Sequence, residues 1–294
     1  MSLISNLVPL NLDEQKQIFW ERGGDYNPQF VYARDYSLAV LTKYGLPSRL
    51  EYEHSQAYLH QHSLKATSVI DHPLSFIELE VLLRDLCVRL GMAPITLVKS
   101  RQQNSRFMMR DDLTLSVQWP AKVSQEQFVS VLNHEIQTHL LRRLNDEHQP
   151  WHAQMHQRPK YWKKTEEGLA IYNSKDKNNP DLRQAALLYT LVYLAQTADF
   201  KTVYQQNLRL GLSPARAFTN SLRVKRGVRD TSQPGGFTKD LVYWEGYHQV
   251  AAYLRDPTHD IRDLYWGKVG LAEIEDLRPQ AITTGLIYPT FVTT

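Results

Sequence analysis

The feature that most constrains this chain is a pair of histidines, His134 and His139, inside a segment with apolar residues at helical spacing. Glu135 follows the first histidine directly. Ser124 stands where a helix N-cap is expected, and Gln127 follows three residues later, which is the pattern of a capping box. The apolar positions that recur at helical spacing are Phe128, Val131, Leu132, Ile136, Leu140, Leu141 and Leu144. We therefore predict one helix that carries both imidazoles and the carboxylate.

These side chains have the chemistry of a zinc site, but their spacing is unusual. Neutral imidazoles suit zinc, and a carboxylate beside the first ligand can take a proton from a zinc-bound water as that water attacks a carbonyl. In an α-helix, histidines at i and i+5 lie about 140° apart, against about 40° for the familiar i and i+4 pair. Both can reach one ion only if the helix contains a π-like bulge or loosens at this turn. From the spacing alone, two polar residues at the edge of a buried helix explain the pattern equally well.

A second stretch, Thr165-Glu166-Glu167-Gly168-Leu169-Ala170, adds two adjacent carboxylates. Thr165 is a predicted N-cap, and a short helix is expected to run from there toward Tyr172. A carboxylate on the inner face of that helix can meet a metal, and Gly168 lets a facing helix approach closely. The alternative is that both glutamates are favourable charges in a first helical turn.

The two stretches together resemble the QEGLA-motif proteins of bacteria and their eukaryotic relatives, the microtubule-associated tyrosine carboxypeptidases. That family pairs a His-Glu-x-x-x-His helix with a downstream Glu-Gly-Leu-Ala segment. The resemblance runs from about Phe19 to about Tyr253. Further stretches that carry it, in order, are Asn27–Phe30, Gln149–His152, Arg223–Gly227 and Gly235–Asp240.

The resemblance implies a zinc metallocarboxypeptidase. It assigns His134, His139 and Glu167 as metal ligands, because the glutamate directly before Gly-Leu-Ala is the constant member of the motif. Glu166 then supports the site from outside the coordination sphere, and Glu135 is the catalytic base. Two histidines and one glutamate leave the fourth zinc position for water, as in catalytic sites. A preference for a C-terminal tyrosine or another aromatic residue follows from the resemblance alone.

A carboxypeptidase also needs a fixed cation to receive the terminal carboxylate of its substrate. Arginine does this with two parallel hydrogen bonds. The resemblance favours Arg223 and Arg226 for this role, with the more flexible Lys239 as a third candidate. Tyr243, on a predicted helix, can stabilise a developing oxyanion, although aromatic residues on helices more often belong to the core. His152 matches a family stretch and is expected to line the cleft, with a solvated loop histidine as the alternative.

Two other functions compete with this interpretation. The basic run around Arg223 and Arg226 also suits a non-enzymatic binding module that holds acidic protein tails. A zinc site without a carboxylate-binding cation would be an endopeptidase. The formal charge of +3 is too small, and the basic run too short, to predict nucleic-acid binding.

The predicted fold is α+β, a mostly helical zincin-like metallopeptidase with a small β-sheet beside the metal-binding helix. Residues 75–90 form a predicted helix closed by Gly91. Extended runs at 95–98, 106–109 and 113–117 lead into the metal helix, and an edge strand there can pair with the backbone of an extended substrate. We expect a single catalytic domain over residues 1–294, with a helical part over 1–90, and the sheet, the metal-site helices and a C-terminal helical part over 91–294.

Composition agrees with an ordinary intracellular enzyme. The 294 residues are 42% hydrophobic and 22% charged, enough for a sizeable core. The one cysteine rules out an intrachain disulfide framework. No targeting or membrane segment is evident, so we expect a cytoplasmic protein that binds the C-terminal tails of peptides or proteins and neither nucleic acid nor membranes. The long extra N-terminal region of the eukaryotic enzymes is not expected here, so tubulin is a possible partner that is not assumed.

Overall fold

The computed structural model describes residues 7–62, 64, 72–101, 105–110, 112–154, 162–174 and 181–292. The chain divides into two compact units, and each is built from two stretches of sequence. Unit 1 is Met1–Thr67 with Asp181–Glu245, and unit 2 is Ser68–Pro180 with Gly246–Thr294. The single catalytic domain expected over 1–294 therefore stays a prediction. No described helix has both the length and the apolar character that crossing a bilayer requires.

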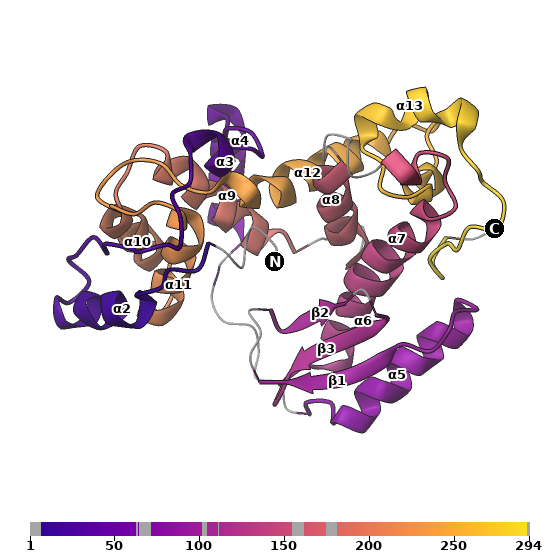
Figure 1. Ribbon diagram of the computed structural model, residues 1–294, viewed down its shortest axis with the longest axis horizontal. Helices are drawn as coiled ribbons and strands as arrows, with labels where there is room; N and C mark the ends of the chain where they lie inside the picture. The colour runs from indigo at the N-terminus through magenta and orange to yellow at the C-terminus, as the bar shows by residue number, and fades with distance from the viewer. Residues whose placement is uncertain are drawn as a thin grey trace. The chain divides into compact units, whose positions relative to one another are not determined.

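Unit 2 contains a three-stranded sheet with helices packed around it (Figure 1). The strands are β1 (Thr96–Ser100), β2 (Phe107–Met109) and β3 (Thr114–Gln118). Their spatial order is β1-β3-β2, with β1 parallel to β3 and β2 antiparallel to it. The predicted extended runs are confirmed to within two residues, and β2 is an edge strand.

Helix α5 (Phe76–Arg89) covers the sheet through an apolar face. Its start is fixed by a capping box between Ser75 and Glu78, and its end is followed by Gly91 at a φ of 64°, which a residue with a side chain rarely adopts. The buried core is shared by α5, the sheet and the histidine helix, the helix over residues 125–146 that carries His134 and His139. It includes Leu79, Leu83, Leu86, Leu97, Phe107, Leu115, Val117, Phe128, Leu132 and Ile136. The α+β class and the helix at 75–90 are confirmed.

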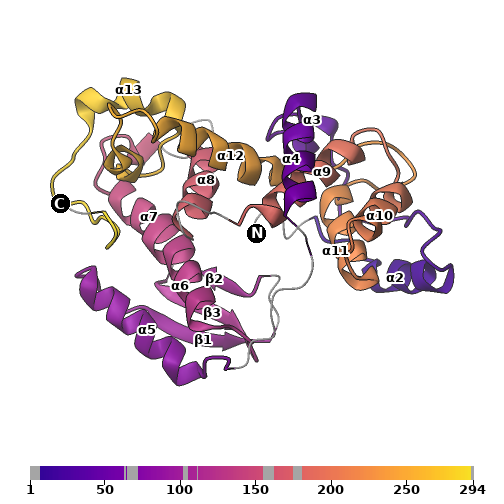
Figure 2. The ribbon, with the colours of Figure 1, turned by 180° about the vertical axis from the view of Figure 1, so that it is seen from behind.

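The histidine helix is one continuous rod of three parts (Figure 2). Helix α6 (Gln125–His134) begins with the predicted capping box, in which Ser124 accepts from the Gln127 N–H and the Gln127 side chain accepts from the Ser124 N–H. It continues as the π-helix η1 (Glu135–Leu140) and then as α7 (Leu141–Asp146). The 3₁₀ turn η2 (His152–Gln154) and helix α8 (Trp162–Ser174) follow.

The C-terminal part of unit 2 packs on α7 and α8. Helix α12 (Leu241–Tyr253) begins in unit 1 and ends in unit 2. It is followed by the 3₁₀ turns η4 (Ile261–Tyr265) and η5 (Leu271–Glu273), the short helix α13 (Ile274–Leu277) and the 3₁₀ turn η6 (Arg278–Gln280). Its core includes Leu141, Leu169, Val250, Leu264 and Tyr265. The final segment, whose role the sequence did not indicate, is bound through its backbone along the histidine helix and the turn that follows it. The amide side chains of Gln149, Asn145 and Gln137 bind the backbones of Ile282, Ile287 and Thr290 respectively.

Unit 1 is helical in its described part. Its elements are α2 (Leu12–Glu21), α3 (Leu38–Leu41), α4 (Arg49–Gln61), α9 (Arg183–Ala195), α10 (Phe200–Arg209), α11 (Pro214–Lys225), the 3₁₀ turn η3 (Thr238–Asp240) and the first part of α12. An aromatic core joins several of them through Phe19, Phe30, Phe200, Tyr204 and Phe218. Thr238, the first residue of η3, uses its hydroxyl to donate to the Leu41 carbonyl at 3.2 Å.

Candidate metal centre

The two histidines of the histidine helix meet because the helix changes its winding between them. Residues Glu135–Leu140 form a π-helix, in which the backbone pairs i with i+5. A π turn takes about 4.4 residues, so an i and i+5 pair lies about 50° apart instead of about 140°. The rings of His134 and His139 have centroids 4.8 Å apart. The π-like bulge that the spacing demanded is confirmed.

Buried side chains satisfy the backbone groups that the π turn disturbs. The Thr138 hydroxyl donates to the Asn133 carbonyl, five residues earlier. The Tyr265 hydroxyl donates to the Gln137 carbonyl at the far end of the turn. Asn173, on α8, donates to both of these hydroxyls at 2.9 Å. This network ties the π turn to two other parts of unit 2.

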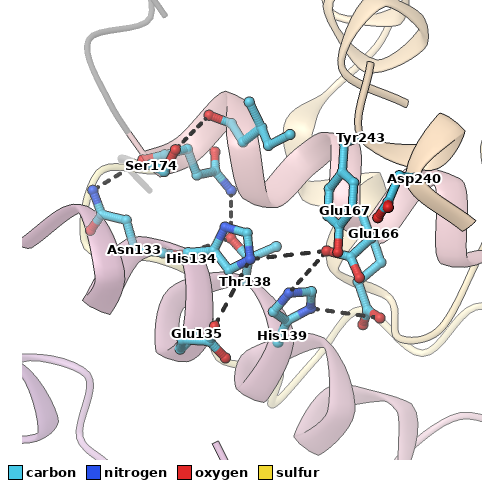
Figure 3. Close-up of polar contacts among 12 residues, drawn as sticks. Asn133, His134, Glu135, Thr138, His139, Glu166, Glu167, Ser174, Asp240 and Tyr243 are labelled. Carbon is cyan, nitrogen blue, oxygen red and sulfur yellow. Dashed lines mark hydrogen bonds and ion pairs between the residues drawn. The ribbon is translucent and has the colours of Figure 1, made fainter. Parts of the chain in front are cut away.

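Three potential ligand atoms converge from two helices. One atom each from His134, His139 and Glu167 lie within 4.8 Å of one another, and this group could hold a metal ion. The Glu167 Oε2 atom is 4.0 Å from the His134 Nε2 atom and 3.7 Å from the His139 Nε2 atom (Figure 3). All three side chains are between 18% and 26% exposed, so the group is open to a small molecule without lying on the surface.

Glu135 lies beside this group and is held by the sheet. Its Oε1 atom is 4.0 Å from the His134 Nε2 atom. Burial raises the pKa of Glu135. The positive charge of His139 and a hydrogen bond from the Met109 backbone N–H act in the opposite direction. Met109 ends the edge strand β2, so the strand positions the carboxylate. A carboxylate with a raised pKa is well suited to accept and return a proton near neutral pH.

Each residue of the Glu167-Gly168-Leu169-Ala170 stretch has a different role in building the site. Glu167 reaches the histidines, and the Ala170 backbone hydrogen-bonds the His134 ring. Gly168 lies so close to the Gly246 backbone of α12 that any Cβ would overlap it, which confirms the predicted close approach. Leu169 is fully buried in the core. This stretch therefore supplies one potential ligand, Glu167, and fixes the ring of another, His134, through the Ala170 backbone.

Thr165 does not cap this helix, contrary to the prediction. Helix α8 already extends from Trp162, so Thr165 lies inside it. Its hydroxyl accepts instead from the Leu271 backbone N–H at 2.9 Å. The two glutamates consequently sit in the second turn of the helix, where burial rather than the end of the helix sets their environment.

Glu166 lies on the opposite side of His139 from Glu167. Its Oε2 atom is 3.6 Å from the His139 Nδ1 atom, and its Oε1 atom is 2.5 Å from the Lys268 Nζ atom. Burial opposes the charge of Glu166, but Lys268, His139 and Arg142 lower its pKa well below the ordinary value. A buried carboxylate on the outer nitrogen of a histidine fixes the ring and makes the inner nitrogen a better metal ligand.

The two histidines differ in their proton affinity. Burial, followed by the neighbouring His139, lowers the pKa of His134 to about 3, so that this ring is neutral. Burial also opposes the charge of His139, but Glu166, Glu167 and Glu135 raise its pKa above the ordinary value. A metal ion must displace that proton, so metal binding at this site is expected to release it.

The remaining predicted site residues are distributed over both units. His152 belongs to unit 2, where its Nδ1 atom is 2.8 Å from the Asp146 Oδ2 atom and its side chain is 43% exposed. Arg223, Arg226, Lys239 and Tyr243 belong to unit 1. Their roles stay predictions.

In unit 1, the two arginines have different surroundings. Arg223 makes a bidentate ion pair with Asp240, through bonds of 2.9 and 2.7 Å. Arg226 lies over the Phe237 ring, and its buried Nε atom has no hydrogen-bond partner among the described residues. Lys239 donates to the Tyr243 hydroxyl at 3.3 Å, and Arg223 hydrogen-bonds the same side chain.

Sequence reasoning missed the residues that support the centre from a distance. Lys268, Tyr265 and Asn173 lie 35 to 128 residues from the helix positions that they contact. No periodicity or motif connects them to the histidines. The one signal available was the isolated charge of Lys268 between Gly267 and apolar Val269.

Comparisons with known proteins find similarity to one protein family. A model of the microtubule-associated tyrosine carboxypeptidase family matches residues 78–294. The mouse protein named microtubule-associated tyrosine carboxypeptidase 1 is 29% identical over 97% of this chain and 64% of its own length. The human protein named putative tyrosine carboxypeptidase MATCAP2 is 30% identical over 99% of this chain and 49% of its own length. The chain thus spans about half to two-thirds of the length of these relatives.

Proposed function

This chain belongs to the family of microtubule-associated tyrosine carboxypeptidases, and we propose that it is a zinc-dependent carboxypeptidase. Its substrates are peptides or protein tails from which it removes the C-terminal residue, a tyrosine or another aromatic residue. The observation that carries the proposal is the π turn, which brings His134 and His139 together with Glu167 and leaves Glu135 beside them. A helix departs from α-winding at a cost, and π turns concentrate at functional sites.

The donor set suits zinc. Two imidazoles and one carboxylate are the protein ligands of many catalytic zinc sites, in which a fourth position is left to water or substrate. Tetrahedral ligands at zinc bond lengths lie about 3.3 Å apart. The 3.7 Å between His139 Nε2 and Glu167 Oε2 needs only a small closure to match this.

The catalytic base is Glu135. Bound zinc supplies a Lewis acid that polarises the scissile carbonyl and acidifies the attacking water. The Glu135 carboxylate, fixed by the Met109 N–H, accepts the proton of that water and returns it to the leaving amine. In this proposal Tyr243 stabilises the oxyanion, since a hydroxyl that accepts from Lys239 and Arg223 is a strengthened donor.

Strand β2 offers a place for the substrate backbone. The Arg110 N–H bonds Thr114 and the Gln118 N–H bonds Arg106, so positions 106, 108 and 110 face β3. The backbone groups of Phe107 and Met109 therefore face the other way, along the edge that also holds Glu135. An extended peptide that added a strand at this edge would have its backbone beside the catalytic base.

Arg226 is the best candidate for the cation that receives the terminal carboxylate. Arg223 is already neutralised by Asp240, and although burial opposes its charge, that ion pair raises its pKa. Burial lowers the pKa of Arg226, whose Nε donor has no hydrogen-bond partner in the part of the chain that the structure describes. A buried cation with an unused donor gains the most from an incoming carboxylate. Lys239 stays a weaker candidate because a flexible ammonium fixes geometry less well.

The natural substrate is proposed only as a class. The name of the mouse relative refers to microtubules, and a tubulin tail is one possible substrate of this chain. Any exposed protein tail that ends in an aromatic residue has the required chemistry. His152, held by Asp146, is proposed to line the cleft that receives it.

The proposal is tested with matched peptides that end in tyrosine, one as the free acid and one as the amide. Release of tyrosine is followed by mass spectrometry for the wild type, Glu135→Gln, Arg226→Gln and Arg223→Gln. We expect cleavage of the free acid alone, because the amide cannot pair with the cation. Glu135→Gln should lose turnover by orders of magnitude while keeping its metal, and Arg226→Gln should lower kcat/KM by roughly 30-fold or more.

Other outcomes select another function. Equal cleavage of acid and amide, or internal cuts, would make the protein an endopeptidase. A wild type that releases no amino acid but binds acidic tails as well as Glu135→Gln does would be a binding module. Elemental analysis of His134→Ala, His139→Ala and Glu167→Ala checks the ligands, since each should lose most of its zinc.

A further inference from the structure

The loop Gly267–Val269 is clamped by two side chains of α7. The fully buried Arg142 donates to the Gly267 carbonyl at 3.0 Å and to the Val269 carbonyl at 2.5 Å. Asp146, one turn later on the same face, accepts from the Lys268 N–H at 2.8 Å. Gly267 has a φ of 130°, and a Cβ there would overlap Asp146. The backbone on both sides of Lys268 is therefore fixed to the histidine helix.

The fixed loop directs the Lys268 side chain inward. Its ammonium lies 2.5 Å from the Glu166 Oε1 atom and 4.7 Å from the centre of the Trp162 ring. The side chain is only 14% exposed, and that of Glu166 only 8%. Burying a lysine is costly, so a loop built to bring its charge to one carboxylate implies a task for that charge.

The task follows from the two adjacent glutamates. Glu167 belongs to the cluster of potential metal ligands, while Glu166 faces the outer nitrogen of His139 at 3.6 Å. Carboxylate oxygens are good zinc ligands, so a released Glu166 could join the ion as a fourth protein ligand beside the water and leave no room for the substrate. Among the described residues, Lys268 makes the shortest contact with Glu166.

We propose that Lys268 is a positioning residue that holds Glu166 on the outer nitrogen of His139 and keeps it from becoming a fourth protein ligand of the metal. This inference rests on the metal centre of the proposed function, and not on the identity of the substrate. Lys268 thereby keeps Glu166 off the ion, so that three protein ligands and a water make it four-coordinate and leave room for the substrate.

The test uses cobalt(II) in place of zinc, because its visible absorption reports the number of ligands. Four-coordinate cobalt absorbs more strongly than five-coordinate cobalt. Spectra and cobalt affinities are measured for the wild type, Lys268→Met, Lys268→Arg, Glu166→Gln and the double variant Lys268→Met with Glu166→Gln. Lys163→Met is the matched control, since its ammonium lies over the same Trp162 ring at 5.5 Å.

In Lys268→Met, we expect the molar absorption of cobalt to fall roughly twofold or more, because Glu166 joins the three protein ligands and the water and the ion becomes five-coordinate. We expect the cobalt dissociation constant to fall roughly tenfold, because a ligand is gained and a nearby cation is lost. Lys268→Arg should keep the wild-type spectrum. The double variant should recover the wild-type spectrum, because a side-chain amide is a poor ligand for such a metal ion. Lys163→Met should match the wild type.

An unchanged spectrum in Lys268→Met overturns the proposal. Weaker cobalt binding in this variant also overturns it, since that is the result expected of a residue that merely supports the fold. A wild type that binds no cobalt overturns the metal centre and this proposal together. A wild type with the expected cobalt spectrum that cleaves no peptide overturns the carboxypeptidase alone.

Discussion

Removing the hydroxyl of Tyr265 should loosen the metal site by destabilising the π turn. Leu141 still pairs its N–H with the Ile136 carbonyl, five residues back, at the point where α-winding resumes. When the helix returns to pairing each N–H with the carbonyl four residues back, one carbonyl is skipped. The skipped carbonyl is that of Gln137. The Tyr265 hydroxyl donates to this carbonyl at 2.8 Å and accepts from Asn173 at 2.9 Å.

Tyr265→Phe keeps the ring and removes both bonds. Tyr265 is fully buried, so no water replaces its hydroxyl without rearrangement. Asn173 keeps its bond to Thr138, but the Gln137 carbonyl is left without a side-chain donor. A buried polar group without a partner costs about 1–3 kcal/mol, and a lost neutral hydrogen bond costs about 1 kcal/mol. We therefore expect the free energy of unfolding to fall by roughly 2–4 kcal/mol.

The assay combines urea unfolding with zinc titration. The zinc affinity of Tyr265→Phe should fall tenfold or more, because a turn that relaxes toward α-winding separates His134 from His139. Tyr189→Phe is the control: this ring is fully buried in unit 1, and its hydroxyl accepts from the Ser48 N–H at 2.9 Å. It should lose stability and keep its zinc affinity. A zinc affinity in Tyr265→Phe equal to the wild type would refute the reasoning.

Two further predictions concern the scaffold. Gly168→Ala should lower the free energy of unfolding by about 3 kcal/mol or more in urea unfolding, because its Cβ overlaps the Gly246 backbone; helix propensity alone predicts the opposite sign, a gain of about 1 kcal/mol. Burial lowers the pKa of the fully buried Lys225 to about 8. Between about pH 8 and 10.5, the folded chain has therefore lost a proton that the unfolded chain keeps. The free energy of unfolding should rise with pH over this range by up to roughly 3 kcal/mol. Urea unfolding at pH 7.5 and pH 10.5 should show this rise in the wild type and not in Lys225→Met, and equal changes in both would contradict it.

The sequence by itself determined the local parts of the site. The capping box at Ser124, the apolar spacing behind it and the positions of His134 and His139 are all encoded within a few turns of one helix. Elementary helix geometry then requires a π turn if both imidazoles are to reach one ion. The edge strand that precedes the helix was equally readable, because alternation and turn residues act over short distances.

Only the tertiary structure decided what surrounds these groups. Glu166 and Glu167 are identical in type and adjacent in sequence, and what distinguishes them is Lys268, about 100 residues later. Arg223 and Arg226 are equivalent in the sequence pattern, and only the fold shows that Asp240 neutralises the first. Thr165 matches the pattern of an N-cap, but the helix begins earlier, at Trp162.

The physical reason is the range of the interactions. Helix winding, caps and strand alternation are short-range properties of the backbone, so they leave periodic signals in the sequence. The pKa of a buried carboxylate, or the partner of a passed-over carbonyl, depends on a single charge or hydroxyl brought from a distant part of the chain, and such a contact leaves no period to detect. The residues that would bind the ion were therefore readable from the sequence, whereas the residues that hold them in place were decided by packing.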